Sequence, residues 1–177
     1  MIATLISSKT RIKLLLKFFL NSNTTAYLRN LEAEFGESSN AIRLELNKFE
    51  ETGLLESFSE GNKKIFQANK NHPLFQDIHN ILIKHVGFDT IIEKVINNMG
   101  EVDKVLVTGA YARGLDNPVI DLIFIGNIDR AYLTYLVEKV ENLINRKVRY
   151  VIYQSEEFEI NVSMKEQDTC LLLWTKE

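Results

Sequence analysis

A pair of short amphipathic helices, interrupted by one glycine, constrains this chain more than any other feature of its sequence. Apolar residues at helical spacing mark the first helix and end just before Gly36. They are Tyr27, Leu28, Leu31 and Phe35. Glycine favours the left-handed backbone that closes a helix. Ser38 or Ser39, both good N-cap residues, then begins a second helix over about residues 40–52, which Gly53 ends. The pattern predicts a helix–turn–helix.

The second of these helices carries a polar face of the kind that reads DNA. In helix–turn–helix proteins the second helix enters the major groove, and its N-terminal residues lie nearest the base edges. Arginine can donate two hydrogen bonds to guanine, and asparagine can pair with adenine. The candidate base-contacting residues are Ser39, Asn40, Arg43 and Asn47. The alternative is a solvated helix face that binds nothing.

A basic hairpin is predicted directly after the two helices. Residues 54–58 and 64–68 have the composition of strands, and Gly61 lies in the turn between them. Lys63 and Lys64 follow that turn and are candidates for contacts with DNA phosphates. Three basic residues of an earlier helix could add contacts to the DNA backbone. They are Lys9, Arg11 and Lys13. Helices followed by a basic hairpin form the winged-helix order.

The first predicted helix, over about Lys9 to Leu20, is apolar nearly all round. A helix of this kind must bury two faces. One face can pack inside its own domain, and the other needs a second domain or a second subunit. The helix is therefore either a central core helix or a dimer contact, and the sequence leaves both open.

Residues 8–73 resemble the winged-helix domain of ArsR-like bacterial regulators. The most specific part of the resemblance is LEAEFGESSNAIRLELNKFEETGLL, with its short helix, glycine turn, longer helix and GLL leading into a strand. The resemblance implies binding to double-stranded DNA and assembly into a homodimer. It does not imply metal sensing, because this segment has no cysteine and only one histidine, His72.

The second half of the chain alternates strands and helices. Apolar strands are predicted at residues 104–108, 120–125 and 147–153, with a helix over about 129–145. VLVTGAYARG followed by VIDLIFIG resembles the minimal nucleotidyltransferase domain of the polymerase-beta-like superfamily. The expected fold is therefore α+β, with an N-terminal winged helix-turn-helix at 1–72, a helical connector at 73–100 and a nucleotidyltransferase-like mixed α/β domain at 101–177.

The nucleotidyltransferase resemblance comes with departures at the residues that carry the chemistry. It implies a Gly-Ser turn that holds the triphosphate, two carboxylates at i and i+2, and a third on the neighbouring strand. The first two carboxylates would hold two divalent metal ions that neutralise phosphate charge, and the third would activate the attacking hydroxyl. Here Ala110 replaces the serine, Val119 takes the first acidic position, and only Asp121 remains. We therefore expect no catalytic residue and no metal ion. Mg²⁺ would be needed only if Asp121, together with Asp116, kept the domain active.

The glycine turn after the first strand of this domain is a candidate anion site. Its backbone N–H groups and Arg113 could face a nucleotide or another anionic effector. The candidate residues are Gly109, Ala110, Arg113, Gly114 and Asp121. The alternative for Asp121 is an ion pair with Arg113 or Arg149.

Composition narrows the function classes. The single cysteine, Cys170, excludes an internal disulfide and favours the reducing cytoplasm. No apolar stretch approaches the ~20 residues that span a bilayer, so we expect no membrane partner. The leading hypothesis is a DNA-binding transcription regulator whose second domain binds an effector or a partner. The alternatives are an active metal-dependent nucleotidyltransferase using Asp121 and a protein–protein interaction module.

Overall fold

The chain is a mixed α+β protein built from two compact units. The computed structural model describes residues 2–99, 101–161 and 170–176. The units are Met1–His85 and Val86–Glu177. The boundary between the units falls within the segment 73–100 that the sequence marks as a helical connector. The α+β class expected from the sequence is confirmed.

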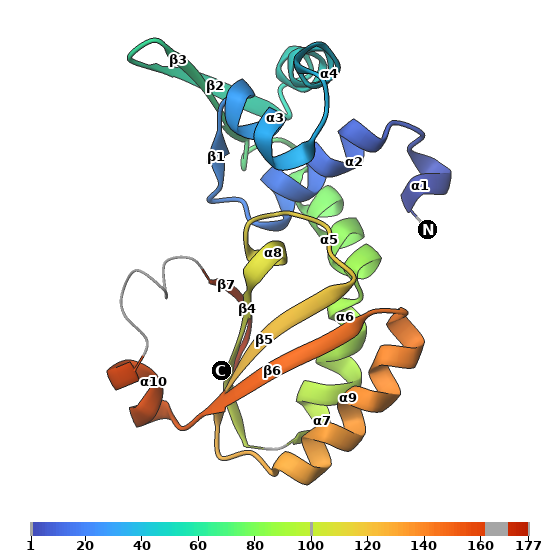
Figure 1. The fold of residues 1–177 in the computed structure, drawn as a ribbon, viewed down its shortest axis with the longest axis vertical. Coiled ribbons are helices and arrows are strands. Elements are labelled where there is room, and N and C mark those ends of the chain that lie inside the picture. The colour runs from blue at the N-terminus through green and yellow to red at the C-terminus, as the bar shows by residue number, and fades with distance from the viewer. Residues whose placement is uncertain (1, 100, 162–169, 177) are drawn as a thin grey trace. The chain divides into compact units, whose positions relative to one another are not determined.

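The first unit combines helices with a small antiparallel sheet. Its elements are α1 (Ile2–Leu5), α2 (Lys9–Leu15), the π-helical turn η1 (Leu16–Leu20), β1 (Thr25–Ala26), α3 (Leu28–Phe35), α4 (Ser39–Glu51), β2 (Leu55–Glu60), β3 (Lys63–Ala68) and α5 (Phe75–Val86). The strands are arranged in the order β1–β3–β2, and β2 and β3 form a hairpin that projects from the helices (Figure 1).

The turn between α3 and α4 follows the sequence pattern. Gly36 takes the left-handed conformation, with φ of 63°, and its N–H donates to the carbonyl of Glu32 at 3.0 Å. Ser38 is the N-cap of α4, because its hydroxyl accepts from the backbone N–H of Ala41. Each end of α4 lies one residue before the predicted end.

The first predicted helix is present over its full length, but its second half is π-helical. Six of its apolar side chains are buried: Leu14, Leu15, Leu16, Phe18, Phe19 and Leu20. The ring of Phe19 packs on Phe75 of α5 at 5.7 Å, and its carbonyl oxygen lies 2.7 Å from Nδ1 of His79. The helix is therefore a core helix of a single chain. Its apolar surface alone does not require a second subunit, so the predicted homodimer stays a prediction.

The second unit is a four-stranded mixed sheet with helices. Its elements are α6 (Phe88–Ile91), the π-helical turn η2 (Ile92–Ile96), α7 (Asn97–Met99), β4 (Val102–Thr108), α8 (Gly109–Ala112), β5 (Val119–Gly126), α9 (Arg130–Ile144), β6 (Lys147–Tyr153), α10 (Ser155–Asn161) and β7 (Leu171–Thr175). The strand order is β6–β5–β4–β7. Strand β4 runs antiparallel to both of its neighbours, whereas β5 and β6 are parallel and connected by α9.

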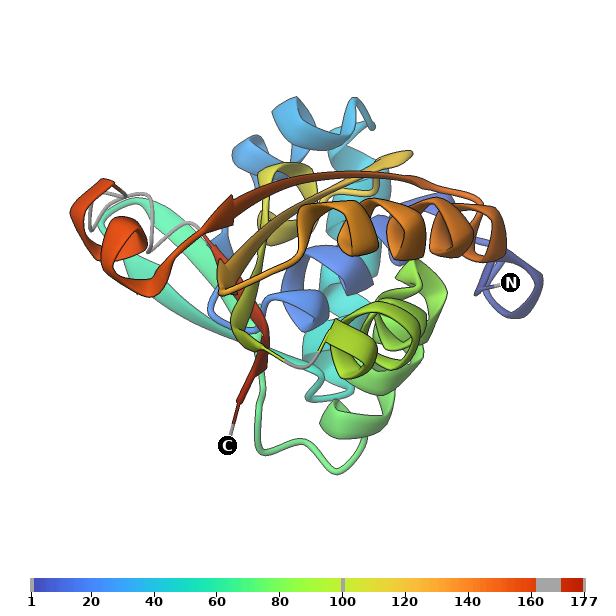
Figure 2. The same ribbon diagram turned by 90° about the horizontal axis from the view of Figure 1, so that it is seen from below.

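The two faces of this sheet differ in burial. Ile120, Leu122 and Phe124 of β5 are buried. Helix α9, which connects β5 to β6, covers one face of the sheet (Figure 2). The alternate residues Asp121 and Ile123 are only half-buried. On β6, Val151 is 50% exposed. The sheet thus has one covered face and one partly open face, and Asp121 lies on the open one. Within the described residues, no helix combines the length and apolar character needed to span a membrane.

Candidate functional site

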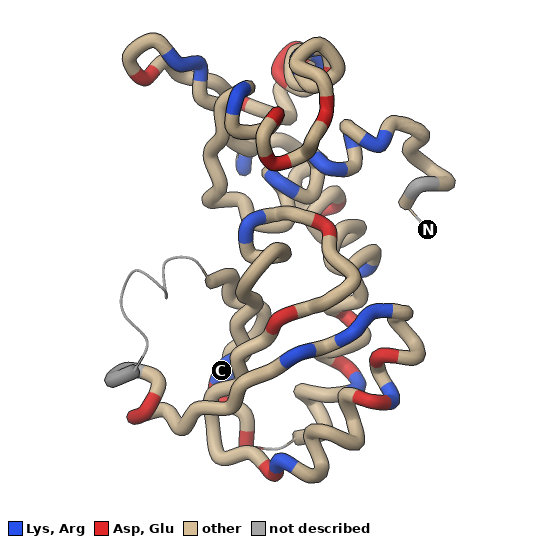
Figure 3. Tube along the Cα trace, viewed as in Figure 1, with Lys and Arg blue, Asp and Glu red and all other residues tan. Residues whose placement is uncertain are grey.

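A groove of about 640 Å³ lies between the start of α3, the helix α4 and the hairpin β2–β3. Four cationic side chains line it: Arg29 of α3, Arg43 of α4, and Lys63 and Lys64 of β3. Figure 3 shows the basic positions on α3 and on the hairpin. Two amides, Asn47 and Asn62, also line the groove, and no described Asp or Glu does. The groove therefore presents a concentrated positive charge in a chain of net charge −3.

The four cations of this groove differ in the contacts that their side chains make. Lys63 Nζ lies 4.5 Å from the centre of the Tyr27 ring, and Lys64 Nζ lies 5.1 Å from that of Phe66. Both distances suit a cation–π contact. Arg29 and Arg43 are exposed and form no ion pair with any residue in the described part of the chain. The two guanidinium groups are thus available to an anionic ligand.

Glu50 of α4 competes for one of the lysines. Its Oε2 accepts from Lys64 Nζ at 2.7 Å, and its Oε1 accepts from the hydroxyl of Ser57 at 2.5 Å. The hydrogen bond from Lys64, followed by that from Ser57, lowers the pKa of the Glu50 carboxyl. The Glu50 carboxylate therefore already forms an ion pair with Lys64, and any other anion must compete with it for this lysine.

The structure brings together four of the six predicted DNA-contacting residues. Arg43, Asn47, Lys63 and Lys64 line the same groove. Ser39 and Asn40 lie in the first turn of α4 and do not line it. Arg29 also lines the groove and was not predicted from the sequence. The sequence offered one signal for it: Arg29 lies two residues after Tyr27, in the first turn of α3.

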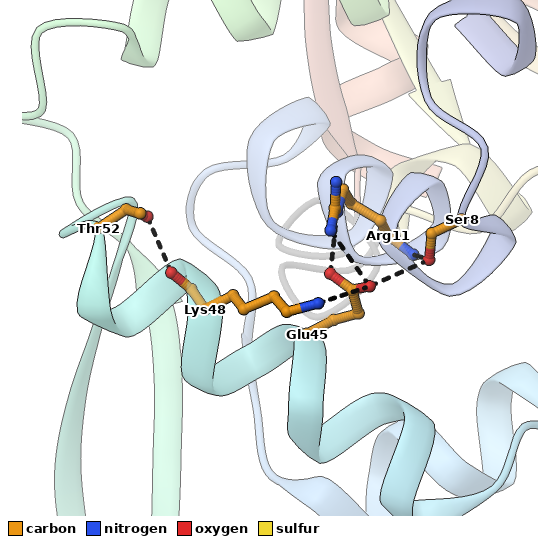
Figure 4. A network of polar contacts seen from close by, with 5 residues as sticks. All are labelled: Ser8, Arg11, Glu45, Lys48 and Thr52. Carbon is orange, nitrogen blue, oxygen red and sulfur yellow. Dashed lines mark hydrogen bonds and ion pairs between the residues drawn. The ribbon is translucent and has the colours of Figure 1, made fainter.

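The basic residues of the first helix have a different role. Arg11 Nε donates to Glu45 Oε2 at 2.8 Å, and Ser8 and Lys48 also contact this carboxylate (Figure 4). Lys13 Nζ pairs with Glu37 at 2.8 Å. These two residues join α2 to α4 and to the turn before α4. The contacts of Arg11 and Lys13 with the DNA backbone stay a prediction.

In the second unit, Asp121 is paired with Arg149. Strand register places Thr108, Asp121 and Arg149 side by side on β4, β5 and β6. Arg149 Nε and Nη2 both lie 2.7 Å from Asp121 Oδ1. Of the two arginines considered for this carboxylate, Arg149 is the partner, and Arg113 is exposed with no ion pair among the described residues. The three aligned residues border a groove of about 410 Å³.

Gly109 packs directly against Asp121. Its φ is +65°, and a Cβ built on it would lie 2.6 Å from Asp121 Oδ2. Both the conformation and the space demand glycine here. Ala110 continues the short helix α8, and Gly114, with φ of 72°, follows it. The predicted anion-site residues thus lie on one turn, with the Asp121 carboxylate beside its first glycine.

Asp116 is held in a separate cluster. The buried Tyr111 places its hydroxyl 2.7 Å from Asp116 Oδ1 and 2.7 Å from the carbonyl of Asn117. Arg146 Nη1 donates to the same two oxygens at 3.0 and 2.7 Å. Burial, and then the Asp116 carboxylate, raise the pKa of Tyr111. Asp116 therefore fixes the loop after α8.

The residues do not fit the two-metal site that the nucleotidyltransferase resemblance implies. Val119 takes the position two residues before Asp121 on the same face of β5, and β6 contains no acid. No group of three His, Cys, Asp or Glu side chains in the described part of the chain is placed to hold a metal ion. The Asp121 carboxylate already forms an ion pair with the guanidinium group of Arg149. We assign no chemical step to a metal ion here.

Comparisons with known proteins give partial structural likenesses. No family model and no curated protein matches the sequence. The protein AF1382 of Archaeoglobus fulgidus is similar over 46% of this chain and 93% of its own, with 20% identity and a TM-score of 0.39. A mutant of the toxin–antitoxin pair MntA–HpeT is similar over 51% and 74%, with 17% identity and a TM-score of 0.41. The Shewanella oneidensis complex of a tri-AMPylated HEPN toxin with its MNT antitoxin is similar over 52% and 73%, with 16% identity and a TM-score of 0.39.

Proposed function

We propose that the chain is a DNA-binding transcription regulator. Its first unit would be a winged helix-turn-helix domain of the ArsR-like type, with α4 as the recognition helix and the hairpin β2–β3 as the wing. Its second unit would be a nucleotidyltransferase-like domain without transferase activity that binds an effector or a partner. Binding to a palindromic site as a homodimer belongs to the same proposal.

The basic groove is the observation that carries this proposal. Cations from three separate elements converge on it without a carboxylate among its lining residues. Neutralising phosphates with Lys and Arg releases counterions from DNA, which supplies much of the binding free energy. A solvated helix face with no ligand would not need cations on α3, α4 and β3 to share one groove.

Different residues of the groove have different tasks in this proposal. Arg43 and Asn47 are exposed on α4 and would contact base edges. Arg29 and Lys63, on the flanking elements, would hold phosphates. The cation–π contact of Lys63 with Tyr27 fixes the hairpin relative to α3 before DNA binds. That preorganisation reduces the entropy lost on binding.

The pairing of Asp121 with Arg149 supports an inactive second unit. A single carboxylate that already accepts two guanidinium N–H groups is a poor holder of two divalent cations. The proposal of an active transferase would need Asp116 as well, and that residue is bound by Tyr111 and Arg146. We therefore favour binding over catalysis for this unit.

The test is selection of bound sequences from random duplex DNA at two salt concentrations, with the oligomeric state recorded. We expect an enriched, roughly palindromic motif. Arg43→Ala should abolish the sequence preference. Arg29→Ala and Lys63→Ala should weaken binding evenly across sequences and lower the salt slope by about 1 each.

Lys70→Ala is the matched control for these variants. Lys70 is an exposed cation of the same unit, but it lies by a different groove and donates to Asn23. Binding should be nearly unchanged in this variant. Absence of salt-dependent DNA binding by the wild-type protein would contradict the proposal and favour the protein-interaction alternative.

A further inference from the structure

The groove between α3, α4 and the hairpin has an apolar floor that the proposed DNA contacts do not use. Leu28, Leu46 and Phe66 line it together with the ring of Tyr27. Leu46 and Phe66 are 1% and 5% exposed, so the half-buried Leu28 and Tyr27 supply most of the apolar surface that a ligand could reach. DNA phosphates would meet the cations above this floor and leave the apolar surface uncovered. Covering apolar surface is favourable, so a ligand with an apolar body gains free energy here.

The cationic side chains that line the groove favour a ligand with a negative charge. Every ionisable group among the lining residues except the Tyr27 phenol is a cation. Arg29, Arg43 and Lys63 have no ion-pair partner among the described residues, and Lys63 is held over the Tyr27 ring, which leaves the two guanidinium groups without a contact of this kind. A neutral apolar ligand would leave these guanidinium groups unused. An anionic group seated between them would accept charge-assisted hydrogen bonds, which are roughly twice as strong as neutral ones.

The volume of the groove and a comparison with a second groove both support a charged small molecule as the ligand. A volume of about 640 Å³ suits a small molecule, because ligand pockets usually enclose roughly 300–1,000 Å³. A second groove of this unit has a volume of about 390 Å³ and contains one lysine, Lys70, together with one carboxylate, Glu56. Its remaining lining residues are mostly polar. Of these two grooves, the first combines apolar lining residues with excess positive charge and the second does not.

We infer that this groove binds a small aromatic anion. The ring packs against Leu28 and the ring of Tyr27, the half-buried apolar side chains of the groove, and covers their apolar surface. Its carboxylate or phosphate lies between Arg29 and Arg43. Because the same arginines are the proposed DNA contacts, the bound anion and DNA exclude one another. That exclusion alone rests on the proposed function, whereas binding of the anion does not.

The direct test uses naphthalene-2-carboxylate as the probe and the full-length protein without DNA. Titration followed by amide NMR shifts should show saturable binding, with the largest shifts in α3, α4 and β3. The neutral analogue 2-naphthylmethanol should bind at least about tenfold more weakly, because it lacks the charge-assisted contacts. Arg43→Gln and Arg29→Gln should each reduce the affinity of the carboxylate by about tenfold.

Lys70→Gln is the matched control and should leave the affinity unchanged. The three substituted side chains are exposed, so the variants should keep the wild-type dispersion of amide signals. Absence of saturable binding would overturn the inference, as would equal affinity for the acid and the alcohol, or wild-type affinity in both arginine variants. If the probe binds and no DNA is bound under any condition, the proposed function fails and the anion site stands. If both bind but the probe does not displace DNA, mutual exclusion is wrong.

Discussion

Arg149 of β6 lies directly opposite Asp121 of β5, and two of its guanidinium nitrogens lie 2.7 Å from a single carboxylate oxygen. The pairing places a permanent cation on β6, the strand on which the nucleotidyltransferase resemblance implies a carboxylate. An arginine stays protonated at all physiological pH values. The carboxylate is therefore neutralised by the protein itself.

We predict that restoring metal binding needs two changes in combination. Arg149→Gln frees Asp121, and Val119→Asp restores a carboxylate two residues away on the same face of β5. The double variant should bind Mn²⁺, detected as paramagnetic broadening of amide signals at the start of β5. Neither the wild-type protein nor Arg149→Gln should show site-specific broadening, because one carboxylate supplies too few ligands. Broadening in the wild-type protein would contradict the assignment of Arg149 as the resident cation.

Gly109 gives a second prediction about the same pair of strands. Gly109→Ala should lower the free energy of unfolding by about 1–3 kcal/mol, because of the positive φ and the approach of Asp121 Oδ2 to the new Cβ. Asp121→Ala removes the oxygen but not the backbone strain. In the Asp121→Ala background the cost of Gly109→Ala should therefore fall without vanishing. A double-mutant cycle from urea unfolding measures this coupling, and strict additivity would contradict the steric account.

The sequence predicted elements well where one local pattern dominates. The strand KVLVT and the strand within VIDLIFIG carry runs of apolar residues, and the glycines at 36 and 109 mark turns that only their backbone freedom permits. The predicted bounds of α4 are accurate to one residue for the same reason. Capping and turn chemistry act over a few residues and can be read without tertiary information.

The contacts of the site residues could not be predicted, because the sequence pattern does not show which residues pair across the fold. Both Arg113 and Arg149 were open partners for Asp121, and only the parallel register of β5 and β6 selects Arg149. Arg11 and Glu45 are 34 residues apart, so nothing in the sequence distinguished a DNA-contacting Arg11 from one that holds α4. Arg29 was missed because its relation to the hairpin is tertiary.

The Glu45 network predicts a pH-dependent stability. Burial of the Glu45 carboxyl raises its pKa, but the hydrogen bond and charge of Arg11 outweigh burial, with help from Lys48 and Ser8. The pKa in the folded protein therefore lies below the ordinary 4.5. The resulting stabilisation is present above that ordinary value, where the carboxylate is charged in both states. It is lost as the pH falls through the lower, folded-state pKa.

Glu45→Gln should remove this dependence. At neutral pH the variant should lose about 1–2 kcal/mol of unfolding free energy, because Arg11 is partly exposed and keeps some hydration. At a pH below the folded-state pKa, the difference from wild type should shrink. Urea unfolding at the two pH values measures both quantities. A difference that is the same at both would indicate that lost packing, not the ion pair, is responsible.

Glu50 predicts a gain of DNA affinity on removal of a charge. Under the proposed function, DNA phosphates must displace the Glu50 carboxylate from Lys64, whose Nζ lies 2.7 Å from it, and Ser57 also holds this carboxylate. Glu50→Gln weakens this competitor and should raise DNA affinity about two- to fivefold at low salt, with a steeper salt dependence. Fluorescence anisotropy with one duplex at several salt concentrations measures both effects.

Glu51→Gln is the control for the Glu50 prediction, because it removes the same charge from the next residue of α4. Glu51 is exposed and forms no ion pair with a described residue. General repulsion of DNA by the helix would give equal gains in the two variants. Competition for Lys64 gives a larger gain for Glu50→Gln, and this excess should disappear when Lys64 is replaced by methionine in both backgrounds. Equal gains would contradict the competition and leave only the net charge of α4 as the cause.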